Sequence, residues 1–171
     1  NDINCNLTLN NVKRSSGTGI IYNNTCKNGN VTILLMGDND IGHLHYTGDS
    51  KLKITSASGD GSTNGKLTVK AAAYGTETNP KWTAAIGGSD GDESFSGLTI
   101  AGGTIIATAD CGAAIGGGGN GSAVVKITGG NVTATNNGPS AAIGGGGGES
   151  GAGGNAEITI EGGTVNATCN G

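Results

Sequence analysis

The chain has 171 residues, of which 36 are glycine and two are proline, and its formal net charge is −4. Glycine does not recur at every third position, which excludes collagen, and 34% apolar residues in short alternating runs argue against disorder. No apolar run reaches the roughly 18 residues that a membrane-spanning helix needs. We therefore expect one folded domain over 1–171 and no membrane insertion.

Short strands separated by turns are predicted for the first half of the chain. Apolar residues alternate with polar ones, as in strands, at 6–12, 18–22, 30–36, 41–46, 51–55 and 66–72. Turn-forming clusters lie between them at 37–40, 59–61 and 64–65. Residues 1–81 are expected to form irregular coils of the fold that the second half defines.

The second half of the chain is an internal repeat. The phrase Ala-Ala-Ile-Gly-Gly begins at Ala84, Ala113 and Ala141, so its copies are almost evenly spaced. A second phrase with a central Gly-Gly recurs at 98–108, 125–135 and 158–168. Three short strands per repeat, with glycine corners, predict an all-β parallel β-helix, right-handed, with about six coils in all. Residues 82–171 are expected to form three regular glycine-rich coils.

Stacking of these repeats assigns side chains to the interior and to the surface. Equivalent aliphatic residues should form four interior ladders: Ile86/Ile115/Ile143, Ile100/Ile127/Ile160, Ile105/Val132/Val165 and Ala107/Ala134/Ala167. The alternate positions should face solvent: Thr99/Lys126/Thr159 and Thr108/Thr135/Thr168. The glycine pairs at 102–103, 129–130 and 162–163 should turn the chain between two strands, where a positive φ is tolerated only by glycine.

The alternation of Ala-Ala-Ile-Gly-Gly-Gly with Ile-Thr-Ile-x-Gly-Gly-Thr-Val-x-Ala-Thr, over about residues 51–171, resembles the glycine-rich β-helix repeats of large secreted and surface-anchored bacterial proteins. Such proteins are often labelled carbohydrate-binding or adhesin-like. The resemblance implies a non-catalytic segment of an extracellular or cell-surface protein whose partner is a glycan or a host or matrix surface. We expect the chain to be a fragment or subunit of a longer assembly.

Exposed aromatic rings are the usual platforms for sugars, and only five aromatic residues are present. Trp82, Tyr74 and Phe95 lie close enough in sequence to form one platform, and the alternative is that Trp82 packs against the irregular end of the solenoid. Glycan binding is assigned to these three rings.

Two groups of residues have the chemistry of metal ligands. His43 and His45 alternate on a predicted strand and should point to one outer face, which suits zinc or copper, or else they are plain surface residues. Asp90, Asp92 and Glu93 crowd one loop and are candidate calcium ligands, with a solvated acidic loop as the alternative. No cofactor is expected apart from calcium at this loop.

The four cysteines show no zinc-binding spacing. Cys5 and Cys26 are separated by close to one coil and are expected to form a disulfide between adjacent coils. Cys111 and Cys169 follow equivalent strands two coils apart, a separation of about 9 to 10 Å, so they should not pair.

Two further functions follow from the same fold. The chain stops directly after a strand without a visible cap, so end-to-end stacking into an extracellular filament is the alternative to the adhesin. A polysaccharide-active enzyme is the third hypothesis, disfavoured because no acid and base pair and no outer-face arginine occurs in the regular coils. A net charge of −6 over residues 82–171 and a single arginine argue against nucleic acid.

Overall fold

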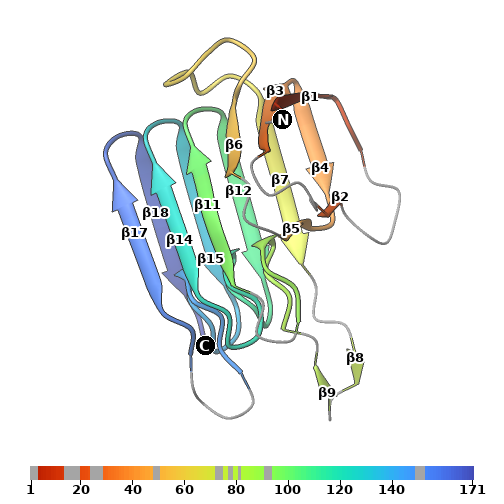
Figure 1. The fold of residues 1–171 in the computed structure, drawn as a ribbon, viewed down its shortest axis with the longest axis vertical. Helices are drawn as coiled ribbons and strands as arrows, with labels where there is room; N and C mark the ends of the chain where they lie inside the picture. The colour runs from red at the N-terminus through yellow and green to blue at the C-terminus, as the bar shows by residue number, and fades with distance from the viewer. Residues whose placement is uncertain are drawn as a thin grey trace.

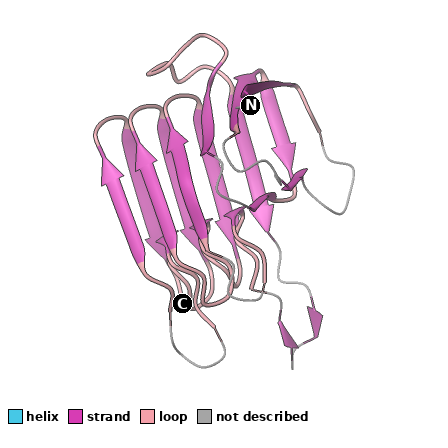
Figure 2. Ribbon diagram, viewed as in Figure 1, coloured by secondary structure: helices cyan, strands magenta, loops and turns pink. Residues whose placement is uncertain are grey.

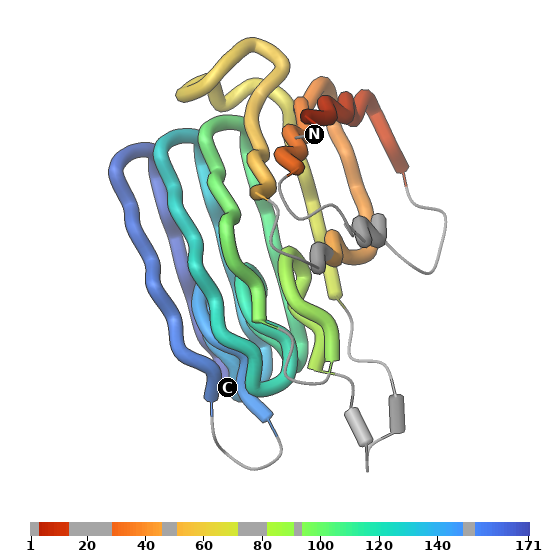
Figure 3. The backbone as a smooth tube through the Cα atoms, in the orientation of Figure 1, coloured from red at the N-terminus to blue at the C-terminus, as the bar shows by residue number. Residues whose placement is uncertain are grey.

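The computed structural model describes residues 4–13, 20–23, 29–47, 51–71, 75–76, 79–80, 82–90, 94–148 and 153–171. All regular structure in these residues is β-strand, and the strands stack into a solenoid in which three parallel sheets run along the axis (Figures 1 and 2). The chain winds through this solenoid coil by coil from its red end to its blue end (Figure 3). No helix long and apolar enough to cross a membrane occurs among the described residues.

The first sheet, called sheet A, has six parallel strands. They are β1 (Asn4–Asn10), β3 (Asn30–Met36), β6 (Lys51–Ser56), β11 (Phe95–Ile100), β14 (Ala123–Ile127) and β17 (Ala156–Ile160). Adjacent strands pair in parallel along the whole row. The predicted parallel β-helix of about six coils is confirmed.

Two further sheets of five strands each complete the coils between the first and the last. Sheet B contains β4 (Asp38–Ile41), β7 (Lys66–Ala71), β12 (Thr104–Ala109), β15 (Asn131–Asn136) and β18 (Thr164–Cys169). Sheet C contains β2 (Ile20–Asn23), β5 (Leu44–Thr47), β10 (Ile86–Gly87), β13 (Ile115–Gly116) and β16 (Ile143–Gly144). A small antiparallel pair, β8 (Gly75–Thr76) with β9 (Asn79–Pro80), lies outside the three sheets.

The interior is formed by the aliphatic ladders that the repeat predicts. Ile86 pairs with Ile115 and Ile115 with Ile143, and the ladders through Ile127 and Ala134 have the expected partners. Ile127 is fully buried, whereas Ile160, its partner on the edge strand β17, is 54% exposed. Burial therefore depends on having a coil on both sides, because each coil is covered only by its neighbours.

Glycine is required at two recurring places in a coil. Gly103 has φ +86° at the corner between sheets A and B, and its equivalents Gly130 and Gly163 have nearly the same angle, as predicted. Gly116 on β13 has φ +140°, and a Cβ there would clash with the carbonyl oxygen of Gly144 in the next coil. The Ile-Gly-Gly phrase thus lets the backbones of sheet C approach closely.

Two predictions for the first half are wrong in detail. The sequence predicts a turn at 37–40, but Asp38 begins strand β4. It also predicts one strand over 41–46, but Ile41 ends β4 and Leu44 begins β5, and both side chains are buried on different sheets. Because these two apolar residues are three apart, they flank a corner and do not follow the alternation of one strand.

Asn39 is the reason that the sequence does not predict strand β4. Its side chain is 1% exposed and lies in register with Leu67, so a polar residue occupies an interior position. The amide donates to the carbonyl oxygens of Met36 and Lys66, at 3.1 and 3.0 Å, and accepts from the Val12 backbone N–H at 3.0 Å. These backbone partners satisfy the buried amide, which makes it compatible with a core position.

Candidate binding groove

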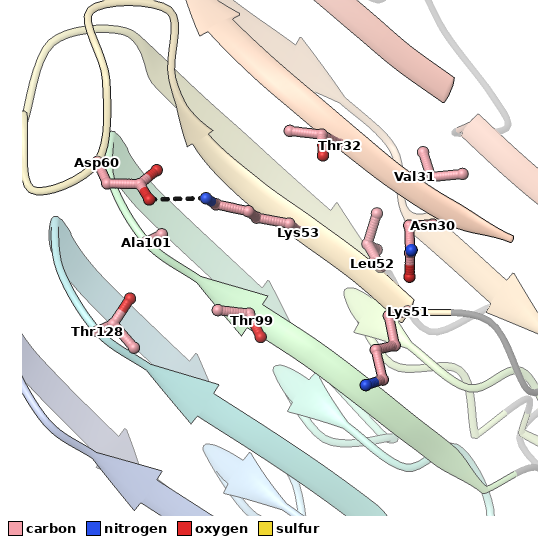
Figure 4. A pocket seen from close by; sticks show the side chains of 10 residues that line it. All are labelled: Asn30, Val31, Thr32, Lys51, Leu52, Lys53, Asp60, Thr99, Ala101 and Thr128. Atoms are coloured by element: carbon pink, nitrogen blue, oxygen red, sulfur yellow. Dashed lines mark hydrogen bonds and ion pairs between the residues drawn. The ribbon is translucent and has the colours of Figure 1, made fainter. Parts of the chain in front are cut away.

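The outer face of sheet A carries a groove of about 280 Å³ that crosses strands β3, β6 and β11 (Figure 4). We call it the sheet A groove, and its lining consists of Asn30, Val31, Thr32, Lys51, Leu52, Lys53, Asp60, Thr99, Ala101 and Thr128. The side chains of Val31 and Leu52 are buried in the core. The side chains that face outward at the groove are mostly polar. The groove is open to solvent and lies on the parallel strands of sheet A.

Strand register places the polar side chains of the groove side by side. Thr32 of β3 pairs with Lys53 of β6, and Lys53 pairs with Thr99 of β11. Two residues earlier on the same face, Asn30 pairs with Lys51. Because side chains alternate across a strand, all five point away from the core on one face.

A loop at 57–65 closes one end of the groove. The loop leaves β6 and returns over the corner between sheets A and B, where the Gly61 N–H donates to the Ala101 carbonyl oxygen at 2.7 Å. The Gly103 N–H donates to the Ser62 carbonyl oxygen at 2.6 Å. These bonds tie the loop to the next coil and hold Asp60 at the groove (Figure 4).

Asp60 forms an ion pair with Lys53 inside the groove. Its carboxylate lies 2.7 Å from the Lys53 ammonium and accepts a hydrogen bond from the Thr55 hydroxyl at 2.8 Å. These two contacts hold the pKa of Asp60 below its ordinary value, against a small opposing effect of burial. Asp60 is therefore ionised at neutral pH and pairs with the Lys53 ammonium.

Lys51 differs from Lys53 in its surroundings. It is exposed, and its ammonium has no carboxylate partner among the described residues. Leu52 pairs with Leu98 of β11. The residue of β11 that corresponds to Lys51 is therefore Gly97, which has no side chain. The groove thus offers one ammonium without a carboxylate partner in the described part of the chain, one paired ammonium, and the hydroxyl and amide groups of four side chains.

Phe95 is wrongly assigned to an exposed aromatic platform, because its side chain is fully buried. A β-bulge between Phe95 and Leu98 shifts the register, and the two residues, three apart, both point into the core. Trp82 is half-buried, and Tyr74 lies outside the described residues. Sugar stacking on Trp82 stays a prediction.

The two histidines lie side by side as expected, but His45 is buried and is not a surface residue. His43 precedes β5, whereas His45 within β5 is 9% exposed, and its Nδ1 lies 3.2 Å from the Gly87 carbonyl oxygen. Because a carbonyl oxygen only accepts, this contact requires a proton on Nδ1. The two rings meet edge to face, with centroids 6.4 Å apart.

Metal binding is predicted from the sequence at the histidines and at the acidic loop. Among the residues that the structure describes, no group of three or more His, Cys, Asp or Glu side chains is placed to hold a metal ion. Asp90 accepts a hydrogen bond from the Trp82 backbone N–H at 3.2 Å, and Asp92 and Glu93 lie outside the described residues. The calcium site stays a prediction.

The cysteine predictions depend on the length of a coil. Cys5 pairs in register with Val31, so the residue that stacks directly on Cys5 is Val31 and Cys26 comes earlier in the sequence. Cys5 is an exposed free thiol, and Cys26 lies outside the described residues. Cys169 pairs with Asn136, which pairs with Ala109, so Cys111 lies two coils away from Cys169 as predicted.

The sheet A groove is not predicted from the sequence. The alternation of Lys51 with Lys53, and of Asn30 with Thr32, places each pair on an outer face. Their juxtaposition depends on the register of Thr32 with Lys53 and of Lys53 with Thr99. The number of residues from Thr32 to Lys53 is smaller than the regular repeat, and the number from Lys53 to Thr99 is much larger. The repeat therefore does not predict these two pairs.

Comparison with known proteins agrees with the fold. A family model described as a beta helix repeat matches residues 98–119, 125–147 and 158–171. No curated protein and no solved structure matches the chain. The matched segments fall on the coils of β11, β14 and β17, and over these coils the chain is similar to β-helix repeat proteins.

Proposed function

We propose that the chain is a non-catalytic segment of an extracellular, adhesin-like surface protein, and that it binds a glycan in the sheet A groove. The observation that supports this proposal is the row of polar side chains from Thr32 through Lys53 to Thr99 across three adjacent parallel strands. Hydroxyl, amide and ammonium groups on a fixed scaffold match the hydrogen-bonding groups of a saccharide.

The titratable groups of the groove support a binding role over a catalytic one. Its lining contains one carboxylate, Asp60, and two lysines. Glycoside hydrolysis uses a pair of carboxyl groups, one of them a general acid with a raised pKa. The pKa of Asp60 is lowered instead, by its contacts with Lys53 and Thr55, so it is poorly suited to donate a proton.

A glycan array with the wild-type chain and a blocked groove tests this proposal. Thr99→Tyr places a bulky side chain at the centre of the groove, on a strand that tolerates aromatic residues. Thr135→Tyr makes the same change at a half-buried outward position of β15 on sheet B and serves as the control. Loss of glycan signal in Thr99→Tyr alone is expected, while an array without any wild-type signal refutes glycan binding.

End-to-end self-association is a second candidate, favoured by the two edge strands of sheet A. Leu7 on β1 is 40% exposed and Ile160 on β17 is 54% exposed. Both belong to the same interior ladder, which runs through Ile33, Ile54, Ile100 and Ile127. A second copy placed head to tail would continue this ladder and cover both residues.

Sedimentation velocity and electron microscopy test this second candidate. The average mass should rise with concentration, and Ile160→Lys should lower it because a charge would enter the apolar contact. Thr159→Lys, on the outward face of the same strand, should leave association unchanged. A single monomeric species at every concentration contradicts the filament.

A further inference from the structure

We infer that the sheet A groove selects acidic glycans, and that Lys51 is the residue that binds their carboxylate or sulfate groups. This inference deepens the proposed function and depends on it. It predicts a chemical class of ligand and a residue that distinguishes acidic from neutral saccharides.

The charge of the groove is opposite to that of the chain. Its lining contains Lys51, Lys53 and Asp60, a net charge of +1, whereas the chain as a whole carries −4. Lys51 is exposed and has no anionic partner within the described part of the chain. Because charges of opposite sign attract, a local positive site on an acidic protein favours an anionic ligand at this place over other surfaces.

Asp60 limits the anion affinity of the groove. Its carboxylate forms an ion pair with the Lys53 ammonium at 2.7 Å, and its negative charge repels an incoming anion. Both side chains are substantially exposed, 39% for Lys53 and 58% for Asp60, so water screens the pair and the bond is weak. Removing the charge of Asp60 should therefore free Lys53 for a ligand and strengthen anion binding.

The same row of side chains continues along the solenoid with a second lysine that is paired with a carboxylate. Thr99 pairs with Lys126 of β14, so Lys53 and Lys126 lie two strands apart on one face. At about 4.8 Å per strand, their backbones are about 9.6 Å apart. Lys126 forms an exposed ion pair with Glu161 at 2.8 Å. A polymer that runs along the axis meets a lysine at every second strand.

The outer face of sheet B provides a contrast within the molecule. Its regular strands β12, β15 and β18 read TIIATA, NVTATN and TVNATC and contain no charged residue. An acidic glycan gains no ion pair there. In these three coils a cation is present on sheet A, Lys126 of β14, and absent from the strands of sheet B; the lysines of sheet B, Lys66 and Lys70, lie on β7.

Two groove variants with opposite expected effects test the inference. Lys51→Gln removes the charge that has no carboxylate partner among the described residues, and Asp60→Asn removes the competing charge but keeps an oxygen that accepts the Thr55 hydrogen bond. The controls are Lys70→Gln, at an exposed position of β7, and Asp110→Asn, whose amide oxygen still accepts from Asn137. Each of the four changes alters the net charge by one unit, so a long-range effect is separated from a local one.

The probes are an array of uronate, sialylated, sulfated and neutral glycans, followed by titration of the best acidic ligand and its nearest neutral analogue. We expect wild type to prefer acidic glycans, Lys51→Gln to weaken binding about fivefold, and Asp60→Asn to strengthen it about fivefold, since an exposed charge pair contributes up to about that factor. Both controls should match wild type.

The outcomes separate this inference from the proposed function. Binding of neutral glycans that Thr99→Tyr abolishes and Lys51→Gln leaves intact overturns acidic selection but supports glycan binding in the groove. Acidic binding that Lys70→Gln weakens as much as Lys51→Gln overturns the role of Lys51. An array without any signal overturns both.

Discussion

The coils at the two ends of the solenoid are built by different rules. From β11 through β14 to β17, Thr99 pairs with Lys126 and Lys126 with Thr159, and each coil repeats the same corners. From β3 through β6 to β11 the coils differ greatly in length, because the loop at 57–65 and the β8–β9 pair are inserted between β6 and β11. The regular coils provide the ladders, whereas the irregular ones form the wall of the groove.

This difference teaches where binding groups arise on a repetitive scaffold. A repeated coil places the same residue class at each position, and such a surface is uniform. An inserted loop breaks the uniformity and brings a residue such as Asp60 to a sheet face that its own coil position would not reach. Substitutions in the regular coils should therefore affect stability, and substitutions at the groove should affect binding.

The largest effect is expected at a glycine of the regular coils. In Gly116→Ala the new Cβ would clash with the Gly144 carbonyl oxygen and would occupy φ +140°. Overpacking and backbone strain together should lower the free energy of unfolding by about 3 kcal/mol or more. Gly153→Ala, where the nearest atom lies 3.7 Å from the new Cβ, should cost far less in urea unfolding. Equal losses in both variants would refute the close approach of sheet C.

A second comparison uses one ladder of sheet A at two positions. Ile127→Ala removes a fully buried side chain and should cost about 2 to 5 kcal/mol. Ile160→Ala changes its partner on β17, which is 54% exposed, and should cost less than half as much. Thermal unfolding of both variants measures the difference. A similar loss in the two would mean that β17 is covered in solution, which is what self-association predicts.

The irregular coils contain a polar interior residue that gives a smaller effect. Asn39→Ala leaves the Val12 N–H and the Lys66 carbonyl without their amide partner. Leaving these partly buried groups without their partner should lower stability by about 1 kcal/mol. Asn137→Ala, which removes an exposed amide bonded to Asp110 at 3.0 Å, is the control with little expected loss. Chemical unfolding that ranks the two in the opposite order would contradict the interior role of Asn39.

The smallest effect concerns the acid stability of the groove loop. The pKa of Asp60 is lower in the folded chain than its ordinary value of 3.8, so its pair with Lys53 stabilises the fold above that pH. This contribution is lost as the pH falls through the lowered pKa, and it amounts to no more than about 1 kcal/mol because the pair is exposed. Unfolding free energies of wild type and Asp60→Asn should therefore converge below pH 3.8. A gap that widens in acid would contradict the ion pair.

The sequence predicts the regular coils well because equivalent residues recur there at nearly constant spacing. Ile115, Ile127 and Ala134 lie in the ladders that the repeat assigns. The prediction fails where local residue types mislead. Asn39 looks like a turn residue and is a buried strand residue, and Phe95 looks like an exposed ring and is turned inward by a bulge.

The groove illustrates a different limit of sequence analysis. Lys51 and Lys53 can be assigned to one face of a strand, but the strand that lies beside them depends on insertions of unequal length. Only the register shows that Thr32 and Thr99 flank Lys53. The position of Asp60 follows from the hydrogen bonds that fasten its loop to Ala101 and Gly103, which have no local signature.

The central claim, glycan binding on sheet A, is tested most directly by the methyl resonances of threonine. Thr32, Thr99 and Thr128 line the groove, whereas Thr108 and Thr135 lie on sheet B. Titration of threonine-labelled protein with the strongest acidic glycan from the array should shift the methyl signals of the first three and leave those of sheet B unchanged. Shifts confined to Thr108 and Thr135 would place the ligand on a different sheet and contradict the account.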